Sequence, residues 1–240
     1  MKNFTAHMAI IVSFVIALAL LSGTIIAQDV KGNGTLKTQT RKVADFEGIK
    51  VSGGFIVEIK QGKQEELRIE AEENLMDNIK SEVKNGVLHL YTEGSFNSRK
   101  GIKAFVTVSD LNKIDISGGV KVTGLSTFKA NTFDLGMSGG SHVTLAIDAN
   151  KLDVEMSGGS KVALSGHADD LEMNMSGAAS VDTRELIAKR VKVESSGASS
   201  VKVHATENLV INASGASHVA YAGSPKIEAQ TTAASRISKL

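Results

Sequence analysis

The sequence predicts an all-β fold, a parallel β-helix or β-solenoid with coils of about 19 residues and a less regular N-terminal part that caps the stack. Three observations lead to this prediction. A Ser-Gly motif recurs down the second half of the chain, the residues beside each copy alternate between apolar and polar, and residues 111–240 show no apolar pattern with helical spacing. We therefore expect residues 111–240 to form the repetitive solenoid.

The Ser-Gly motif repeats at a nearly constant spacing. Its leading Ser residues are separated by 18 to 21 residues. Repeats of this length stack on one another, because a single unit cannot bury its own apolar face. The copies are ISGGVKV at 116–122, MSGGSHV at 137–143, MSGGSKV at 156–162, MSGAASV at 175–181, SSGASSV at 195–201 and ASGASHV at 213–219, with a degenerate copy, TTAASRI, at 231–237.

Each repeat contains two short strands separated by a corner. Before one Ser-Gly motif Leu152, Val154 and Met156 alternate with polar residues, and after it Val162 and Leu164 do the same. A period of two is typical of a strand with one buried face, and equivalent strands would stack about 4.8 Å apart. Most of the length variation lies at the second corner of each coil, so individual features are expected there.

Residues 46–110 predict an irregular N-terminal β region that continues the solenoid. A further copy of the corner, VSGGFIVEIKQG at 51–62, begins 65 residues before the next one. Elements between the two copies would protect the open end of the stack, where strand edges are unpaired. The expected elements are strands at 66–72 and 86–91, a turn at Asn85-Gly86 and a short helix at 73–83.

The first 27 residues predict a signal peptide. Lys2 supplies a positive start, residues 8–21 are almost wholly apolar, and Ile25-Ile26-Ala27 precedes Gln28. An uncleaved membrane anchor is the alternative, although the apolar run is short for a span of roughly 20 residues. We therefore expect an exported chain without a membrane span, in the periplasm, on the outer cell surface or outside the cell, with residues 28–45 as a polar lead-in.

The corner positions differ in what they tolerate. The second position is always Gly until Ala233 in the last copy, which predicts a positive φ or a close neighbouring backbone. Strand parity places Gly158 and Ser160 inward, and Ala179 at the position of Ser160 indicates that this Ser is replaceable. The structural corner residues are Gly118, Gly139, Gly158, Gly177, Gly197 and Gly215, with Ser138, Ser157, Ser176, Ser196 and Ser214 leading them.

The leading Ser has two interpretations. A hydroxyl group occurs there in every copy, and it could satisfy amides of its own turn. The alternative is a ladder of hydroxyls that binds a sugar polymer. The structural interpretation is favoured, because the chain offers only Tyr91 and Tyr221, and no Trp, as aromatic platforms.

No catalytic, metal or cofactor site is predicted. His142 and His218 share a column but lie four coils apart, roughly 19 Å at the spacing of stacked strands. Outward carboxylates could in principle form a glycosidase pair, but a solvated polar ladder is the more common arrangement. These columns contain Asp134, Asp153 and Glu172, and then Glu155, Asn174, Glu194 and Asn212. The balance of 27 basic and 26 acidic residues gives no electrostatic case for nucleic acid.

Two N-terminal segments suggest a family. FEGIKVSGGFIVEIKQG at 46–62 and AEENLMDNIKSEVKNGVLHLY at 71–91, followed by the SGGS and SGAS corners, resemble the head GIN domain family, which is described as an autotransporter adhesin domain. The resemblance covers about residues 43–240. It implies a secreted bacterial β-helical domain with a role in adhesion, and it brings no catalytic residues.

We therefore expect an exported, non-enzymatic adhesin or binding module of the cell surface or periplasm, whose partner is a surface polysaccharide or a protein. The alternatives are a carbohydrate-active enzyme, either a polysaccharide lyase or a hydrolase, and a structural envelope protein without a specific ligand. Binding is expected where the copies differ, and oligomerisation through the open end of the stack is a further option. The candidate binding residues are His142, Lys161, Lys202 and His218.

Overall fold

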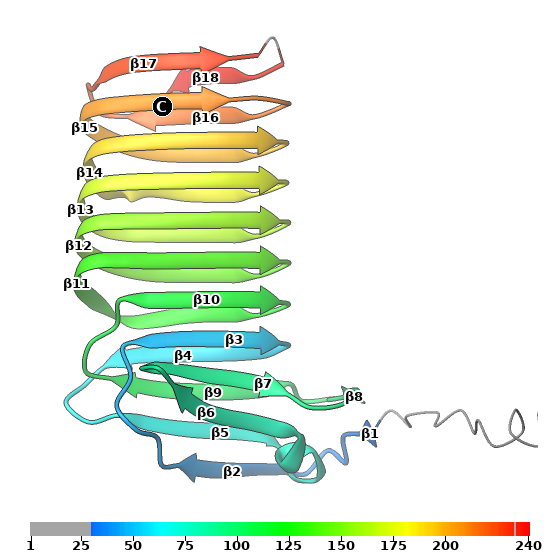
Figure 1. Cartoon of the computed structure of the whole chain (residues 1–240). Coiled ribbons are helices and arrows are strands. Elements are labelled where there is room, and N and C mark those ends of the chain that lie inside the picture. Colours follow the sequence, from blue (N-terminus) through cyan, green and yellow to red (C-terminus); the bar gives the residue numbers. More distant parts are fainter. Residues whose placement is uncertain (1–29, 233) are drawn as a thin grey trace, which may run out of the picture.

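The protein is a β-solenoid in which coils stack along one axis (Figure 1). The computed structural model describes residues 30–232 and 234–240, so the predicted signal peptide at 1–27 lies outside the described residues. The chain is nearly all β and makes about seven turns with a spacing of about 19 residues. The predicted fold class is confirmed.

Five long strands form the regular part of the stack. Each begins after one Ser-Gly corner, bends at the opposite corner and ends at the next Ser-Gly corner. Neighbours pair in parallel, and β12 meets β13 in register from His142↔Lys161 to Gly158↔Gly177. The five are β11 (Lys121–Gly139), β12 (His142–Gly158), β13 (Lys161–Gly177), β14 (Ser180–Gly197) and β15 (Ser200–Ala213), and the last coils are β16 (His218–Ala222), β17 (Lys226–Thr231) and β18 (Arg236–Lys239).

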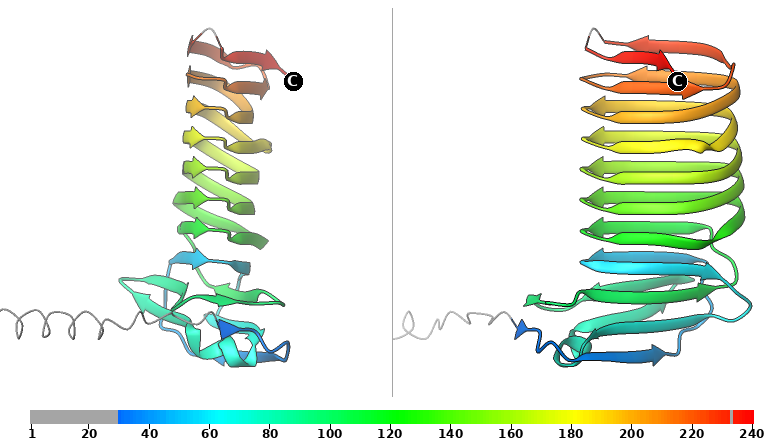
Figure 2. Two further views of the ribbon diagram at one scale, coloured as in Figure 1. Left: turned by 90° about the vertical axis from the view of Figure 1, so that its right-hand side faces the viewer. Right: turned by 180° about the vertical axis from the view of Figure 1, so that it is seen from behind.

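The two straight runs of each coil form two layers that face each other (Figure 2). Layer 1 contains the runs that end at a Ser-Gly corner, such as residues 151–158, and layer 2 contains the runs that follow the corner, such as residues 161–168. Leu152 and Met156 of layer 1 and Val162 of layer 2 are buried between the layers, each at most 4% exposed. Burial of these alternating apolar side chains is the main force that holds the coils together.

The outlying corner at residue 52 belongs to the same stack. β3 (Gly48–Gly53) and β4 (Phe55–Gln61) form a first coil, and β10 (Lys113–Gly118) pairs directly with β3. Ser52 is therefore the register partner of Ser117, although 65 residues separate them in the chain. The long gap is an insertion between two adjacent coils.

The insertion and the lead-in cover the N-terminal end of the stack (Figure 1). β9 continues one sheet in parallel below β4, and β7 continues the other below β3. Antiparallel strands then follow on both sides, where β2 pairs with β5 and β6 pairs with β7. The elements are β1 (Val30–Lys31), β2 (Leu36–Arg41), β5 (Glu66–Glu72), η1 (Glu73–Asn78), β6 (Ile79–Lys84), β7 (Val87–Thr92), β8 (Phe96–Asn97) and β9 (Ile102–Val108).

The short helix predicted at 73–83 is only partly right. A 3-10 helix ends at Asn78, and residues 79–84 form β6 instead. Asn85 and Gly86 both have positive φ, +52° and +72°, which suits a tight hairpin turn between β6 and β7. This turn, together with the alternation that buries Ile79, outweighs the helix propensity of the segment.

Glu72 is a fully buried carboxylate that ties the lead-in to the insertion. Its two oxygens accept hydrogen bonds from the Gly34 amide at 2.8 Å, the Ser98 hydroxyl at 2.7 Å and the Arg99 amide at 2.9 Å. Burial alone would raise the pKa of Glu72, but these hydrogen bonds outweigh burial and the pKa is lowered. The carboxylate is thus satisfied by hydrogen bonds within the fold.

In the part of the chain that the structure describes, no helix has the length and apolar character to span a bilayer.

Candidate functional site

The Ser-Gly corners are built by stacked glycine backbones. The six second-position Gly residues have φ between +73° and +101°, which confirms the predicted backbone requirement. A Cβ on Gly158 would lie 2.8 Å from the carbonyl oxygen of Gly139, whereas a Cβ on Gly159 would contact nothing within 4 Å. Gly158 is exposed, so its predicted inward position is wrong. The backbone of the neighbouring coil, rather than the core, excludes a side chain there.

The fourth-position Ser residues close the corners from inside. Ser160 is fully buried, and its hydroxyl donates to the carbonyl oxygens of Gly139 at 3.2 Å and Ser157 at 3.4 Å. Ser141 donates in the same way to Gly118, at 2.9 Å. These buried hydroxyls therefore link each turn to the coil before it.

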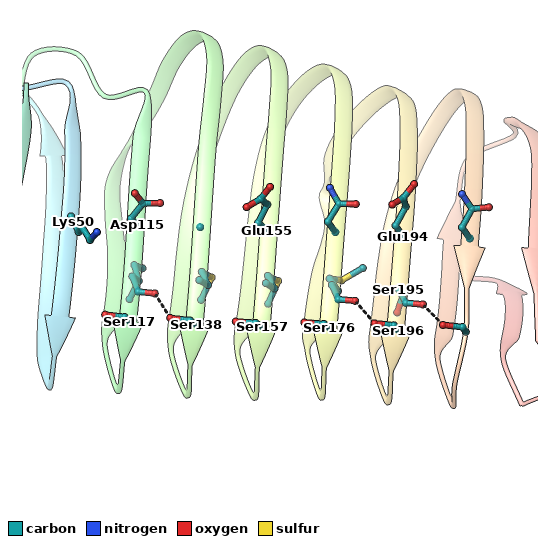
Figure 3. A pocket seen from close by; sticks show the side chains of 18 residues that line it. Lys50, Asp115, Ser117, Ser138, Glu155, Ser157, Ser176, Glu194, Ser195 and Ser196 are labelled. Carbon is teal, nitrogen blue, oxygen red and sulfur yellow. Dashed lines mark hydrogen bonds between the residues drawn. The ribbon is translucent and has the colours of Figure 1, made fainter. Parts of the chain in front are cut away.

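The leading Ser residues form an outer row. Ser138 donates to the carbonyl oxygen of Ile116 at 3.3 Å, and Ser196 donates to that of Met175 at 3.4 Å (Figure 3). These hydroxyls bond the carbonyl of the preceding coil, which differs from the expected bond to amides of their own turn. All six leading Ser residues are half-buried or exposed, so the oxygen can still accept a hydrogen bond from outside.

This outer row borders a groove of about 980 Å³ on the outside of layer 1 (Figure 3). We call it the serine groove. Its hydroxyl side spans five coil steps from Ser117 to Ser214, about 24 Å at the spacing of stacked strands. The leading Ser residues 117, 138, 157, 176, 196 and 214 form one side, and the other side contains Lys50, Asp115, Gly136, Glu155, Asn174, Glu194 and Asn212, paired coil by coil.

The floor of the groove changes along the stack. Met137, Met156 and Met175 lie below the first coils and are each 4% exposed. Ser195 takes the equivalent position in the next coil, and its hydroxyl lies 2.9 Å from that of Ser217. The groove has no aromatic lining residue, so it offers hydrogen bonds and charge rather than stacking surfaces.

The charges of the groove are only partly compensated. Asp115 lies 3.6 Å from Lys113, and Glu194 lies 3.0 Å from Lys192. Among the described residues Glu155 has no basic partner within 4 Å. Carboxylates and carboxamides alternate in the coils of Glu155, Asn174, Glu194 and Asn212, which gives the groove both acceptors and donors.

The neighbouring column of layer 1 is held in ion pairs. Lys151 lies 2.8 Å from Asp153, and Lys192 lies 2.9 Å from Glu172. Hydrogen bonds to Glu172 and Glu194 raise the pKa of Lys192 to about 12, and the same contact with Lys192 lowers the pKa of Glu172. The carboxylates that the sequence offered as a glycosidase pair thus mostly neutralise neighbouring Lys residues.

The four candidate binding residues of the sequence lie on layer 2, across the Ser-Gly corner from the groove. His142 and Lys161 are register partners in adjacent coils. Lys202 and His218 lie three and four coils beyond His142, and Ser180 and Ser200 interrupt the column of His142 and His218. The structure therefore brings them together as two pairs on one face. Within residues 30–232 and 234–240, no group of three or more His, Asp and Glu side chains is placed to hold a metal ion.

The sequence predicts both rows of residues that border the groove, but it does not predict that the two rows form one site. The sequence favours a structural role for the Ser row, and a solvated ladder for the column of Glu155, Asn174, Glu194 and Asn212. The signal that could have joined them is their spacing of two residues, since this places Glu155 and Ser157 on the same side of one strand.

The molecule is thus a parallel β-solenoid with an open groove along one layer, bordered by hydroxyl, carboxylate and carboxamide groups. Residues 45–225 match the family described as "Putative auto-transporter adhesin, head GIN domain". The chain belongs to this family. Comparison with curated proteins shows no match.

Several crystal structures share the fold. A "putative adhesin" from Bacteroides fragilis has a TM-score of 0.83 and 22% identity, covering 88% of this chain and 100% of its own. A "putative lipid binding protein" from Parabacteroides distasonis has a TM-score of 0.76 and 21% identity, covering 89% and 100%. A "putative adhesin" from Parabacteroides merdae has a TM-score of 0.69 and 18% identity, covering 88% and 99%. At these identities the likeness establishes the fold alone.

Proposed function

We propose that the protein is an exported, non-enzymatic adhesin of the cell envelope that binds a linear polysaccharide along the serine groove. The observation that carries this proposal is the row of six leading Ser hydroxyls beside a column of carboxylates and carboxamides, repeated at each coil. The family description as an adhesin supports it. The apolar leader at residues 1–27 supports export.

The chemistry of the groove suits sugar hydroxyls. Carboxylates such as Glu155 accept charge-assisted hydrogen bonds, and carboxamides such as Asn174 both donate and accept. The Ser oxygens add acceptors on the other side. A polymer that lies along the solenoid axis would meet a similar set of groups about every 4.8 Å.

Each contact in the groove is expected to be weak, because no aromatic ring stacks on a sugar face there. Affinity would then come from many contacts made by one chain, so that longer oligosaccharides bind more tightly than short ones. This dependence on length distinguishes the groove from a pocket that recognises a single sugar.

The test is calorimetry of the mature chain with a length series of neutral and charged oligosaccharides chosen from a glycan array. The variant Glu155→Ala with Asn174→Ala removes two adjacent groups of the groove, and we expect affinity to fall at least about tenfold. The matched control is Glu228→Ala with Asn208→Ala, which removes the same residue types from layer 1 outside the groove. The control is expected to bind like the wild type.

Three results would contradict the proposal. Binding of no glycan at all would favour a structural envelope protein without a ligand. Equal affinities for the groove variant and the wild type would place the ligand elsewhere, for example at His142 and Lys161. New reducing ends or unsaturated products would show a carbohydrate-active enzyme.

A further inference from the structure

The two layers carry opposite charge although the whole chain is nearly neutral. On layer 2, seven basic residues face outward against four acidic ones, whereas on layer 1 eight acidic residues face outward against six basic ones. The basic residues of layer 2 are Lys60, Lys121, Lys129, Lys161, Arg184, Lys202 and Arg236, and its acidic residues are Glu58, Asp148, Asp182 and Glu185. Four His residues, 142, 167, 204 and 218, also face outward on layer 2.

Fewer of the basic side chains on layer 2 than on layer 1 form ion pairs with acidic side chains. Among the described residues, Lys121, Lys161 and Lys202 have no acidic partner within 4 Å, and Lys202 lies beside Asp182 only as its register neighbour. On layer 1, by contrast, five of the six basic residues are in ion pairs: Lys113, Lys151, Arg190, Lys192 and Lys226. Layer 2 therefore has positive charge available for a partner.

Exposed apolar side chains accompany these charges. Ile56 and Ile187 occupy outward positions of layer 2 and are 38% and 41% exposed, and Leu125 at the bend of β11 is 58% exposed. Thr144 and Ala163, which are register partners on this face, carry small side chains. A basic sheet face with exposed apolar side chains matches the boundary of an anionic bilayer, since a soluble polyanion offers nothing to bury the apolar groups.

We propose that the outer face of layer 2 docks onto an anionic lipid surface, with Lys121, Lys161 and Lys202 near the headgroups and Ile56 and Ile187 at the interface. The serine groove lies on the outside of layer 1. Because the two layers are opposite faces of the stack (Figure 2), the groove would then face away from the membrane. This docking does not depend on what the groove binds.

The test is co-sedimentation of the mature chain with vesicles of phosphatidylcholine alone, or of phosphatidylcholine with one part in three of phosphatidylglycerol. We expect binding to the anionic vesicles only, weakening as salt is raised. The variant Lys121→Gln, Lys161→Gln, Lys202→Gln should lose on the order of 100-fold in partitioning. The matched control is Lys113→Gln, Lys151→Gln, Lys226→Gln, which makes the same change in net charge on layer 1. This control should keep most of the partitioning of the wild type onto anionic vesicles.

A second variant separates lipid from other polyanions. Ile56→Ser with Ile187→Ser should weaken vesicle binding several-fold and leave binding to soluble dextran sulfate unchanged. The proposal is overturned by an absence of binding to anionic vesicles, by equal losses in the two Lys variants, or by binding to dextran sulfate without binding to vesicles. Glu155→Ala with Asn174→Ala should still bind vesicles, so failure of the groove and failure of this docking are distinguishable.

Discussion

The two corners of each coil behave differently. At the Ser-Gly corner the register continues without interruption, from Ser157↔Ser176 to Gly158↔Gly177. At the opposite corner the register shifts, between Ala163 and Ser165 in one coil and between Thr183 and Ile187 in the next. At the Ser-Gly corner the second-position Gly of each coil lies against the Gly of the preceding coil and leaves no room for a side chain, whereas the opposite corner absorbs the differences in length.

This difference determines where a regular binding surface can form. The serine groove lies beside the corner that keeps its register, so its hydroxyls and carboxylates recur at equal steps. The opposite corner varies in length and charge, with Lys189 paired to Asp169 in one coil and Gly223 with φ +94° in another. A repetitive polymer would make equivalent contacts in successive coils only beside the Ser-Gly corner.

The largest effect should come from changing the length of a corner. Two residues, Gly-Ser, inserted between Gly158 and Gly159 would separate the stacked backbones, and we expect a loss of about 3 kcal/mol or more in the free energy of unfolding. The same two residues inserted after Asn150, at the opposite corner, should cost under about 1 kcal/mol. Denaturation followed by circular dichroism measures both, and similar losses would show that the two corners are equivalent.

A smaller difference in stability is expected between Ala substitutions at two adjacent Gly residues of one Ser-Gly corner. Gly158→Ala introduces a side chain at φ +82° and 2.8 Å from the Gly139 carbonyl oxygen, so we expect a loss of about 2 kcal/mol. Gly159→Ala meets open space, and the equivalent residue of the next coil is Ala178, so its cost should be near zero. Equal thermal stability of the two variants would refute the stacked-backbone geometry.

The smallest effect should distinguish the two Ser positions. Ser160→Ala removes a buried hydroxyl that bonds two carbonyl oxygens, and the expected loss is about 1 kcal/mol, because Ala179 is accommodated at the same position one coil later. Ser157→Ala removes an exposed hydroxyl and should cost less than about 0.5 kcal/mol. A larger loss for Ser157→Ala, measured in the same unfolding assay, would reverse the assignment of the two rows.

The regular coils could be predicted almost completely, because their contacts repeat. The register of Met156 with Met175 and of Lys161 with His142 follows from aligning the copies of the motif. The insertion could not be placed in this way. Its strands reverse direction, and the turn at Asn85-Gly86 made residues 79–84 a strand although their composition also suits a helix.

The candidate site was predictable only in part. The outward direction of Glu155 and of Ser157 follows from strand parity alone. Their union into a groove depends on how six coils stack beside one another, which a single repeat does not contain. The role of the leading Ser also depends on the preceding coil, since the carbonyl that accepts from Ser138 belongs to Ile116, 22 residues earlier.

The sequence by itself determined the period, the two strands of each coil, the apolar interior and the Gly residues of the corner, because these are properties of one repeat and of its backbone. Only the tertiary structure decided that Ser52 lies beside Ser117 and that the insertion covers the end of the stack. These features come from pairing between distant segments, and local alternation carries no information about which segments pair.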